Sequence, residues 1–228
     1  MGVLTRETHL QISYIMETDK FCISIGRELG SGGKSIALIL GRELGVQVYD
    51  NRLLQMAAEE NGFSPEIFKS ADETSGTKGG GAFGAVSRII SSPFSHLGNM
   101  YGSSMNKSAL FRMQSDIIYN RAKEENCIMV GRCADYILRT HPRHLRVFVR
   151  ADVEDRVRRI CERDKMNRDD ALALIGRIDR QRRDYHDFYC ETNWGCSSAY
   201  DLCVNSSLLG IDETARFVLD YARRLFGL

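Results

Sequence analysis

A glycine-rich turn near the start of the chain has the composition of a phosphate-binding loop. It lies between an apolar run at 21–25 and a mostly apolar run at 35–44. Glycine suits such a turn because side chains would block the approach of backbone N–H groups to an anion, and because several positions need unusual backbone angles. Lys34 would neutralise the β- and γ-phosphates of a nucleoside triphosphate, and the Ser35 hydroxyl would ligate Mg²⁺. The residues predicted to hold the nucleotide are Gly30, Ser31, Gly32, Gly33, Lys34 and Ser35.

The turn departs at one position from the usual P-loop pattern, G-x-x-x-x-G-K-S/T. Counting back five residues from Gly33 reaches Glu28, where the pattern has glycine. Gly26 and Gly30 bracket that position, so we expect a reshaped turn. The alternative is a Gly/Ser-rich turn that binds nothing. Phosphate binding is favoured because a strand, a turn, a lysine, a serine and a helix all coincide.

The elements that position this turn are short apolar strands alternating with helices. This alternation predicts an α/β fold of the P-loop NTPase type, a three-layer arrangement with a five-stranded parallel sheet and helices on both faces. Asp152 is expected to cap one helix, and the last helix should bury Ile211, Ala215, Val218, Leu219 and Ala222. The expected strands are 21–25, 46–49, 127–130, 145–150 and 201–205; the expected helices are 35–44, 50–60, 106–125, one ending at 139, 152–163, 168–189 and the C-terminal segment.

One domain is expected over 21–228, preceded by a loose extension at 1–20. Residues 61–105 are rich in glycine and serine. Long loops in compact domains are usually functional, so we expect a mobile insertion that helps to bind the acceptor. The alternative is a surface insertion without a role.

Arginines gather in the second half of the chain, with nine between Arg156 and Arg183. Arg177, Arg180 and Arg183 are spaced to lie near one helical face, and arginine binds phosphate oxygens in a bidentate way. This predicts a lid at about 164–190 that closes over a transferred phosphoryl group. The alternative is a solvated charged helix, because aspartates are interleaved with the arginines.

Composition narrows the partners. A net charge of +1 gives no general case for binding nucleic acid or a membrane surface. The seven cysteines include no C-x-x-C pair, so reduced thiols are the simplest interpretation. No apolar run is long enough to span a bilayer, and the N-terminus lacks a signal sequence. We therefore expect a cytoplasmic protein with no structural metal site.

Several segments together resemble the cytidylate kinase-like family. They are Phe21–Lys34 with its run Ile-Gly-Arg-Glu-Leu-Gly-Ser-Gly-Gly-Lys, Val48–Leu54, Val130–Leu138 with Gly-Arg-Cys-Ala-Asp, and Tyr200–Asn205. The glutamate that breaks the P-loop pattern is typical of that family. The resemblance implies a nucleoside monophosphate kinase architecture in which Arg132 contacts the acceptor. Cys133 stands where related cytidylate kinases have an aspartate, and Asp135 is a candidate substitute.

The expected activity is transfer of the ATP γ-phosphoryl group to a nucleoside monophosphate, with CMP or dCMP the first candidates. ATP and Mg²⁺ are the expected cofactors. Asp50, at the end of a strand, would orient the acceptor phosphate or a Mg²⁺-bound water, or else cap a helix. The other interpretations are a P-loop kinase of another small molecule and a nucleotide-binding regulator without turnover. The predicted catalytic residues are Lys34, Arg132, Arg177, Arg180 and Arg183; the predicted substrate contacts are Asp50, Arg132 and Asp135.

Overall fold

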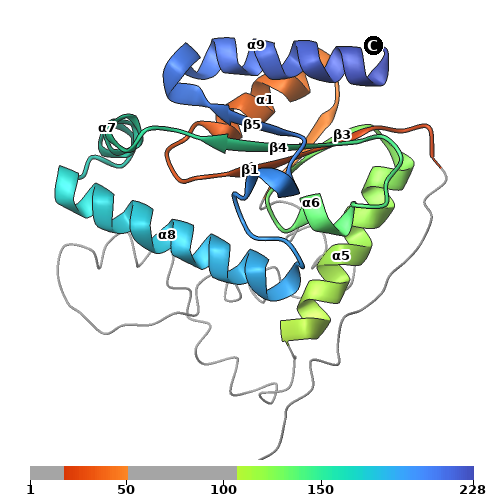
Figure 1. The fold of residues 1–228 in the computed structure, drawn as a ribbon, viewed down its shortest axis with the longest axis horizontal. Helices are drawn as coiled ribbons and strands as arrows, with labels where there is room; N and C mark the ends of the chain where they lie inside the picture. Colours follow the sequence, from red (N-terminus) through yellow and green to blue (C-terminus); the bar gives the residue numbers. More distant parts are fainter. Residues whose placement is uncertain (1–17, 51–106) are drawn as a thin grey trace, which may run out of the picture.

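The computed structural model describes residues 18–50 and 107–228, which contain a single all-parallel sheet (Figure 1). Its strand order is β2-β3-β1-β4-β5, and each neighbouring pair is parallel. The carboxyl ends of all five strands therefore lie at one edge, where ligands bind in open α/β sheets. The strands are β1 (Cys22–Arg27), β2 (Gln47–Tyr49), β3 (Cys127–Val130), β4 (His144–Arg150) and β5 (Leu202–Asn205).

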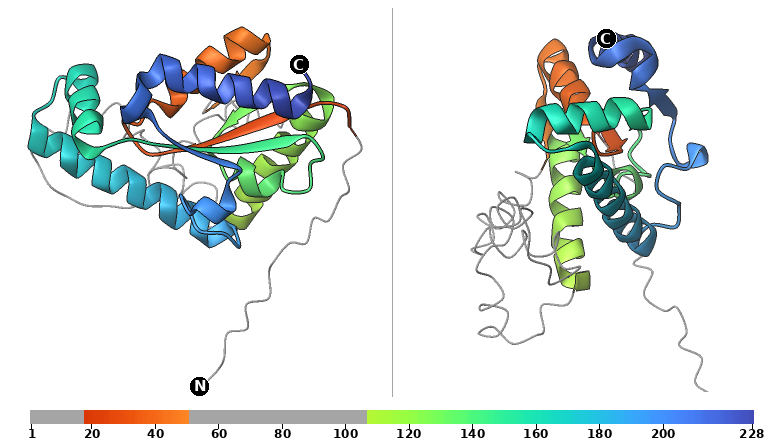
Figure 2. Two further views of the ribbon diagram at one scale, coloured as in Figure 1. Left: turned by 45° about the horizontal axis from the view of Figure 1, so that its top comes forward. Right: turned by 90° about the vertical axis from the view of Figure 1, so that its left-hand side faces the viewer.

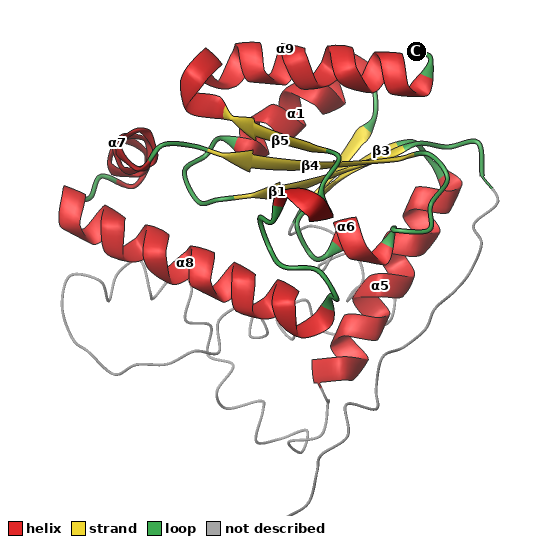
Figure 3. Ribbon diagram, in the orientation of Figure 1, coloured by secondary structure: helices red, strands yellow, loops and turns green. Residues whose placement is uncertain are grey.

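Helices cover both faces of the sheet, which confirms the predicted fold class (Figures 1 and 3). One face carries α1 (Gly33–Leu44) and α9 (Ser206–Phe226). The other carries α5 (Lys107–Glu124), the short α6 (Ala134–Ile137) and α8 (Arg168–Tyr189). The turned views show α8 running across the face opposite α9 (Figure 2). Between β4 and α8, α7 (Val153–Asp164) packs against the start of α8, and a 3₁₀ turn (Ser197–Ala199) precedes β5.

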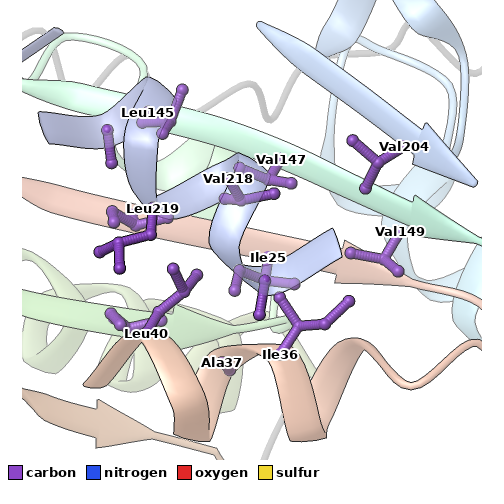
Figure 4. Close-up of a cluster of buried hydrophobic side chains, with 14 of the residues drawn as sticks. Ile25, Ile36, Ala37, Leu40, Leu145, Val147, Val149, Val204, Val218 and Leu219 are labelled. Carbon is purple, nitrogen blue, oxygen red and sulfur yellow. The ribbon is translucent and has the colours of Figure 1, made fainter. Parts of the chain in front are cut away.

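The larger core lies between the sheet and the pair α1 and α9 (Figure 4). Ile25 and Val147 point from the sheet toward Leu40 of α1 and Val218 of α9, and all four are fully buried. The opposite face is filled by a second cluster around Met129, Ile118 and Leu138. Strands that are apolar on both faces thus acquire cover on both faces, as a parallel sheet requires.

The strands and helices predicted within 18–50 and 107–228 are present, and the differences have local causes. β1 continues to Arg27, while α1 begins at Gly33 because Gly32 takes the N-cap position in a left-handed conformation. Instead of reaching Arg139, α6 ends after one turn at Ile137. Asp152 occupies the N-cap position of α7 but makes no capping hydrogen bond; its carboxylate accepts a hydrogen bond from Asn205. The apolar face predicted for the last helix is buried, with Ile211 half-buried.

Some predictions concern segments outside the described residues. These are the helix expected after Asp50, the acceptor-binding insertion at 61–105 and nearly all of the N-terminal extension. Among the helices at 18–50 and 107–228, none is long and apolar enough to cross a membrane.

Candidate active site

The predicted phosphate loop connects β1 to α1 at the carboxyl edge of the sheet. Gly30 and Gly32 have φ of 78° and 81°, a left-handed conformation that disfavours other residues. The first N–H groups of α1 have no acceptor within the helix and carry the positive end of its dipole. Lys34 and Ser35 are exposed at this same end. These residues fit a nucleotide polyphosphate with Mg²⁺: N–H groups and an ammonium for the phosphates, and a hydroxyl for the cation.

Glu28, the residue that breaks the P-loop pattern, fixes the loop to its surroundings. Its carboxylate accepts a hydrogen bond from the Ala151 N–H (3.0 Å), and its Oε2 lies 3.3 Å from Nη1 of Arg156. The carbonyl of Glu28 accepts hydrogen bonds from both the N–H and the hydroxyl of Ser31. The glutamate therefore closes the loop internally and anchors it to the end of β4.

Two of the residues predicted to contact phosphate also pack the loop against the protein. Ser31 is fully buried, and its carbonyl accepts a 2.6 Å hydrogen bond from the Ser206 hydroxyl at the start of α9. A Cβ at Gly30 would lie 2.9 Å from the carbonyl oxygen of Arg156. A side chain at Gly30 would thus clash with the backbone at Arg156.

Arginines from the cluster between Arg156 and Arg183 support the loop from outside. Buried Arg156 donates to the Leu29 carbonyl (2.8 Å) and pairs with Asp179, whose other oxygen accepts from the Leu29 N–H (2.8 Å). Arg159 donates to the Gly30 carbonyl (3.1 Å), and Arg182 to the Arg27 carbonyl (3.1 Å). Part of the arginine cluster is therefore structural. No local pattern indicates these roles, because the contacts join residues more than 120 positions apart.

Lys34 forms an ion pair with Asp50, with 2.7 Å between Nζ and Oδ2. The lysine side chain is 66% exposed and the aspartate 20%. An ion pair this open contributes little to stability, so phosphates can displace the carboxylate from the ammonium. The pair brings the predicted lysine and the predicted acceptor contact to one place, across the ends of α1 and β2.

A second turn follows β3, beside the phosphate loop. Gly131, Arg132 and Cys133 all have positive φ, at 75°, 60° and 57°. Two consecutive non-glycine residues in this region cost free energy, and such strain clusters at functional sites. The Arg27 guanidinium lies directly over Gly131, since a Cβ there would come within 1.8 Å of its Nη1. Gln114 of α5 donates to the Arg132 carbonyl (3.0 Å) and helps to hold this turn.

The two residues considered for base selectivity lie inside the protein. Asp135 is 7% exposed, and its Oδ2 lies 2.8 Å from Nε2 of His186 on α8. Cys133 is 3% exposed, and burial together with the neighbouring Cys190 raises the pKa of its thiol. In this conformation neither side chain faces an acceptor, and the role predicted for Asp135 stays a prediction.

Arg177, Arg180 and Arg183 are exposed along α8, away from the residues that fasten the helix to the loop. Arg183 lies over the Trp194 ring, 5.5 Å from its centroid, and Trp194 packs edge-on against Phe148. Arg177 and Arg180 form no ion pair with any residue in the described part of the chain. They are thus the arginines that could turn toward a bound phosphate.

Comparison with known proteins agrees with this arrangement. Residues 22–208 match the cytidylate kinase-like family, which is more than half of the chain. The chain belongs to this family. A cytidylate kinase from Pyrobaculum islandicum is 33% identical over 108 residues, which are 47% of this chain and 58% of that protein. This cytidylate kinase-like chain therefore spans little more than half the length of that relative.

Two solved structures are similar over nearly the whole chain. An uncharacterised protein from Eubacterium ventriosum has a TM-score of 0.66 at 25% identity, covering 89% of this chain and 98% of that one. A gluconokinase from Sinorhizobium meliloti has a TM-score of 0.52 at 13% identity, covering 92% and 96%. At that identity the likeness is one of fold, and it places this cytidylate kinase-like chain among the P-loop kinase folds.

Proposed function

We propose that this protein transfers the γ-phosphoryl group of ATP to a nucleoside monophosphate, with CMP or dCMP the first candidates. The observation that supports this most directly is that the first N–H groups of α1, the Lys34 ammonium and the Ser35 hydroxyl all lie at one end of that helix. On the neighbouring strand the turn bearing Arg132 offers a second cationic site. The family membership and the name of the Pyrobaculum relative support the same reaction.

The residues would act by positioning and charge, without a covalent intermediate on the protein. The loop N–H groups and Lys34 would hold the donor phosphates, while Arg27 and Arg132 would hold the acceptor phosphate. Arg177 and Arg180 would swing over the transferred group and stabilise its developing charge. Ser35 is the residue that would hold Mg²⁺, which when bound neutralises phosphate charge.

The alternative is a P-loop kinase of another small molecule, and one observation favours it. Cys133 and Asp135 are engaged with α8, so the positions expected to recognise a base contribute no side chain to the acceptor site. Selectivity for cytosine would then have to come from other residues. An acceptor that lacks a base would need only the cationic turn.

A coupled assay of ADP release tests both proposals over a panel of nucleoside monophosphates, sugar acids and hydroxy acids. Lys34→Ala should abolish turnover, whereas Arg42→Ala, an exposed change two turns along the same helix, should leave it intact. Turnover confined to CMP and dCMP supports the first proposal, and turnover with a non-nucleotide acceptor supports the second. Binding of ATP without turnover on any acceptor would contradict both and indicate a regulator.

A further inference from the structure

Four buried polar side chains meet where α6 lies against the C-terminal end of α8. Cys133 and Asp135 come from the turn after β3 and the start of α6, and His186 and Cys190 from the end of α8. All four are between 3% and 8% exposed. Asp135 Oδ2 lies 2.8 Å from Nε2 of His186, and Asp187 Oδ1 lies 3.3 Å from its Nδ1. The two thiols lie close enough to each other, and Cys190 to His186, for each group to shift the pKa of its neighbour.

The charges in this cluster make the two thiols unequal. Burial alone would lower the pKa of His186, but its hydrogen bonds to Asp135 and Cys190 outweigh burial and raise the pKa to about 10. The hydrogen bond from Cys133 lowers the pKa of Cys190; burial opposes this, and the contact with protonated His186 lowers it further. Burial raises the pKa of Cys133. Cys190 is therefore the nucleophile, and Cys133 keeps its proton.

We propose that Cys190 and Cys133 form a dithiol site that reacts with hydrogen peroxide and closes to a disulfide. The Cys190 sulfur attacks one peroxide oxygen and the O–O bond breaks. The departing hydroxide takes a proton from His186, which leaves water and a sulfenic acid on Cys190. The Cys133 sulfur then attacks that of Cys190, the S–O bond breaks, and the hydroxyl leaves as water with the Cys133 proton. Two thiols are oxidised, and one peroxide is reduced to two waters.

The placement of the other thiols makes this pair distinct. Cys22 and Cys127 on neighbouring strands are also in contact, with 3.8 Å between their sulfurs, but both are fully buried in the sheet. Cys161 is half-buried, and Cys196 and Cys203 are exposed to any oxidant, large or small. The proposed site combines a protonated histidine with a nearly closed environment, which favours peroxide over a bulky disulfide such as oxidised glutathione.

The disulfide would join two parts of the site. Cys133 directly follows Arg132 in the strained turn, and Cys190 ends the helix that carries Arg177, Arg180 and Arg183. Closing the bond would tie the acceptor turn to the lid helix, so phosphoryl transfer should fall. This consequence rests on the proposed function, whereas the dithiol chemistry itself does not.

The test uses the full chain with Cys196 and Cys203 changed to serine, reduced and then treated with hydrogen peroxide. Mass spectrometry of unreduced peptides should show a link between Cys133 and Cys190, removable by dithiothreitol. Cys133→Ser should instead accumulate a Cys190 sulfenic acid that dimedone traps, and Cys190→Ser should give neither product. Asp135→Asn should slow oxidation about tenfold, because His186 loses the closer of its two carboxylate partners and keeps only Asp187 at 3.3 Å. Asp184→Asn, an exposed change on the helix that carries His186, should not slow it.

Several results would overturn the proposal. One is an equal rate of thiol oxidation in Asp135→Asn and the parent, and another is a disulfide that forms preferentially between Cys22 and Cys127. The others are a faster reaction with oxidised glutathione than with peroxide, and no disulfide between Cys133 and Cys190 in the folded protein. Circular dichroism of each variant separates a slow reaction from a failure to fold. A disulfide that forms in a protein without kinase turnover would support the thiol site and contradict the proposed function alone.

Discussion

The carboxylate of Glu28 meets a backbone N–H from the end of β4 and a guanidinium from α7. Arg156, which supplies that guanidinium, also pairs with Asp179 of α8 and donates to the loop carbonyl of Leu29. Three charged side chains outside the phosphate-binding positions thus set the path of the loop. The arginine is 6% exposed, so each of its partners would be left with a poorly solvated charge if it were removed.

Removing Arg156 should therefore destabilise the protein strongly. Arg156→Ala is expected to lower the free energy of unfolding by about 3–5 kcal/mol, the usual cost of breaking a buried ion pair from one side. Arg158→Ala is the matched control, since Arg158 lies two residues away on the same helix, is exposed, and forms a surface ion pair with Asp155. Urea unfolding of both variants measures the difference, and equal midpoints would contradict this account of the loop.

Placing the glycine of the usual P-loop pattern at position 28 should lower the stability of the protein. Glu28→Gly leaves the Ala151 N–H without its acceptor and removes one partner of Arg156, so we expect a loss of about 1–3 kcal/mol in stability. The KM for ATP should rise because the loop N–H groups are no longer held in place. Glu28→Gln keeps an acceptor for Ala151 and should lie between glycine and the parent. Tighter ATP binding by the glycine variant would show that the glutamate does not shape the site.

At the scale of elements, α8 has two roles on different sides. One side fastens to the phosphate loop through Asp179 and Arg182, and the other exposes Arg177 and Arg180. The alternative interpretation, in which the arginines lie on a solvated surface and pair with carboxylates, holds for some members of the cluster. Arg158, Arg163 and Arg168 pair with carboxylates close to them. A lid role is left to the arginines without such partners among the described residues.

Changing the exposed arginines should affect turnover and not stability. Arg177→Gln and Arg180→Gln are each expected to lower kcat at least about tenfold, because they would stabilise charge that develops on the transferred group. The unfolding midpoint should not change, since neither side chain packs in the core. Arg168→Gln at the start of the same helix serves as the control. Steady-state kinetics with the best acceptor measures the effect, and unchanged kcat in both variants would remove these residues from the lid.

The elements themselves were predictable from local pattern. Apolar runs such as 127–130 form strands because both faces of a parallel sheet are covered, and Gly45 ends α1 in a left-handed conformation. The starts of α1 and α6 were less predictable, because each follows a left-handed residue, Gly32 or Cys133, that the sequence pattern does not mark. The support of the loop was beyond prediction, since Leu29 and Asp179 are 150 positions apart.

At the scale of the whole molecule, the parallel sheet brings distant segments to one edge. The phosphate loop follows β1, Asp50 follows β2, the Arg132 turn follows β3, and Ser206 follows β5 to contact the loop. The opposite end of the sheet is held by another network. There His144, at the start of β4, contacts the Leu138 carbonyl through Nδ1 (3.0 Å) and the Ser24 hydroxyl through Nε2 (2.8 Å).

This network predicts how stability depends on pH. Burial lowers the pKa of His144 to about 4, and the nearby His141 adds to the effect. Between pH 4 and the ordinary value of about 6.5, the unfolded chain binds the proton and the folded chain does not. The contribution of His144 to the free energy of unfolding is therefore complete above pH 6.5 and is lost as the pH falls toward 4. This contribution is at most about 3 kcal/mol.

Chemical unfolding at a series of pH values between 4 and 8 measures this contribution, with His144→Gln as the comparison. The variant should be less stable than the parent at pH 7, because glutamine fits the two hydrogen bonds less well, yet its stability should fall less between pH 6.5 and 4.5. His9 lies outside the described residues, and His9→Gln also removes one histidine. It therefore controls for the loss of a titrating group. If the parent and His144→Gln lost stability in parallel over that interval, the buried histidine would not be the group that takes up the proton.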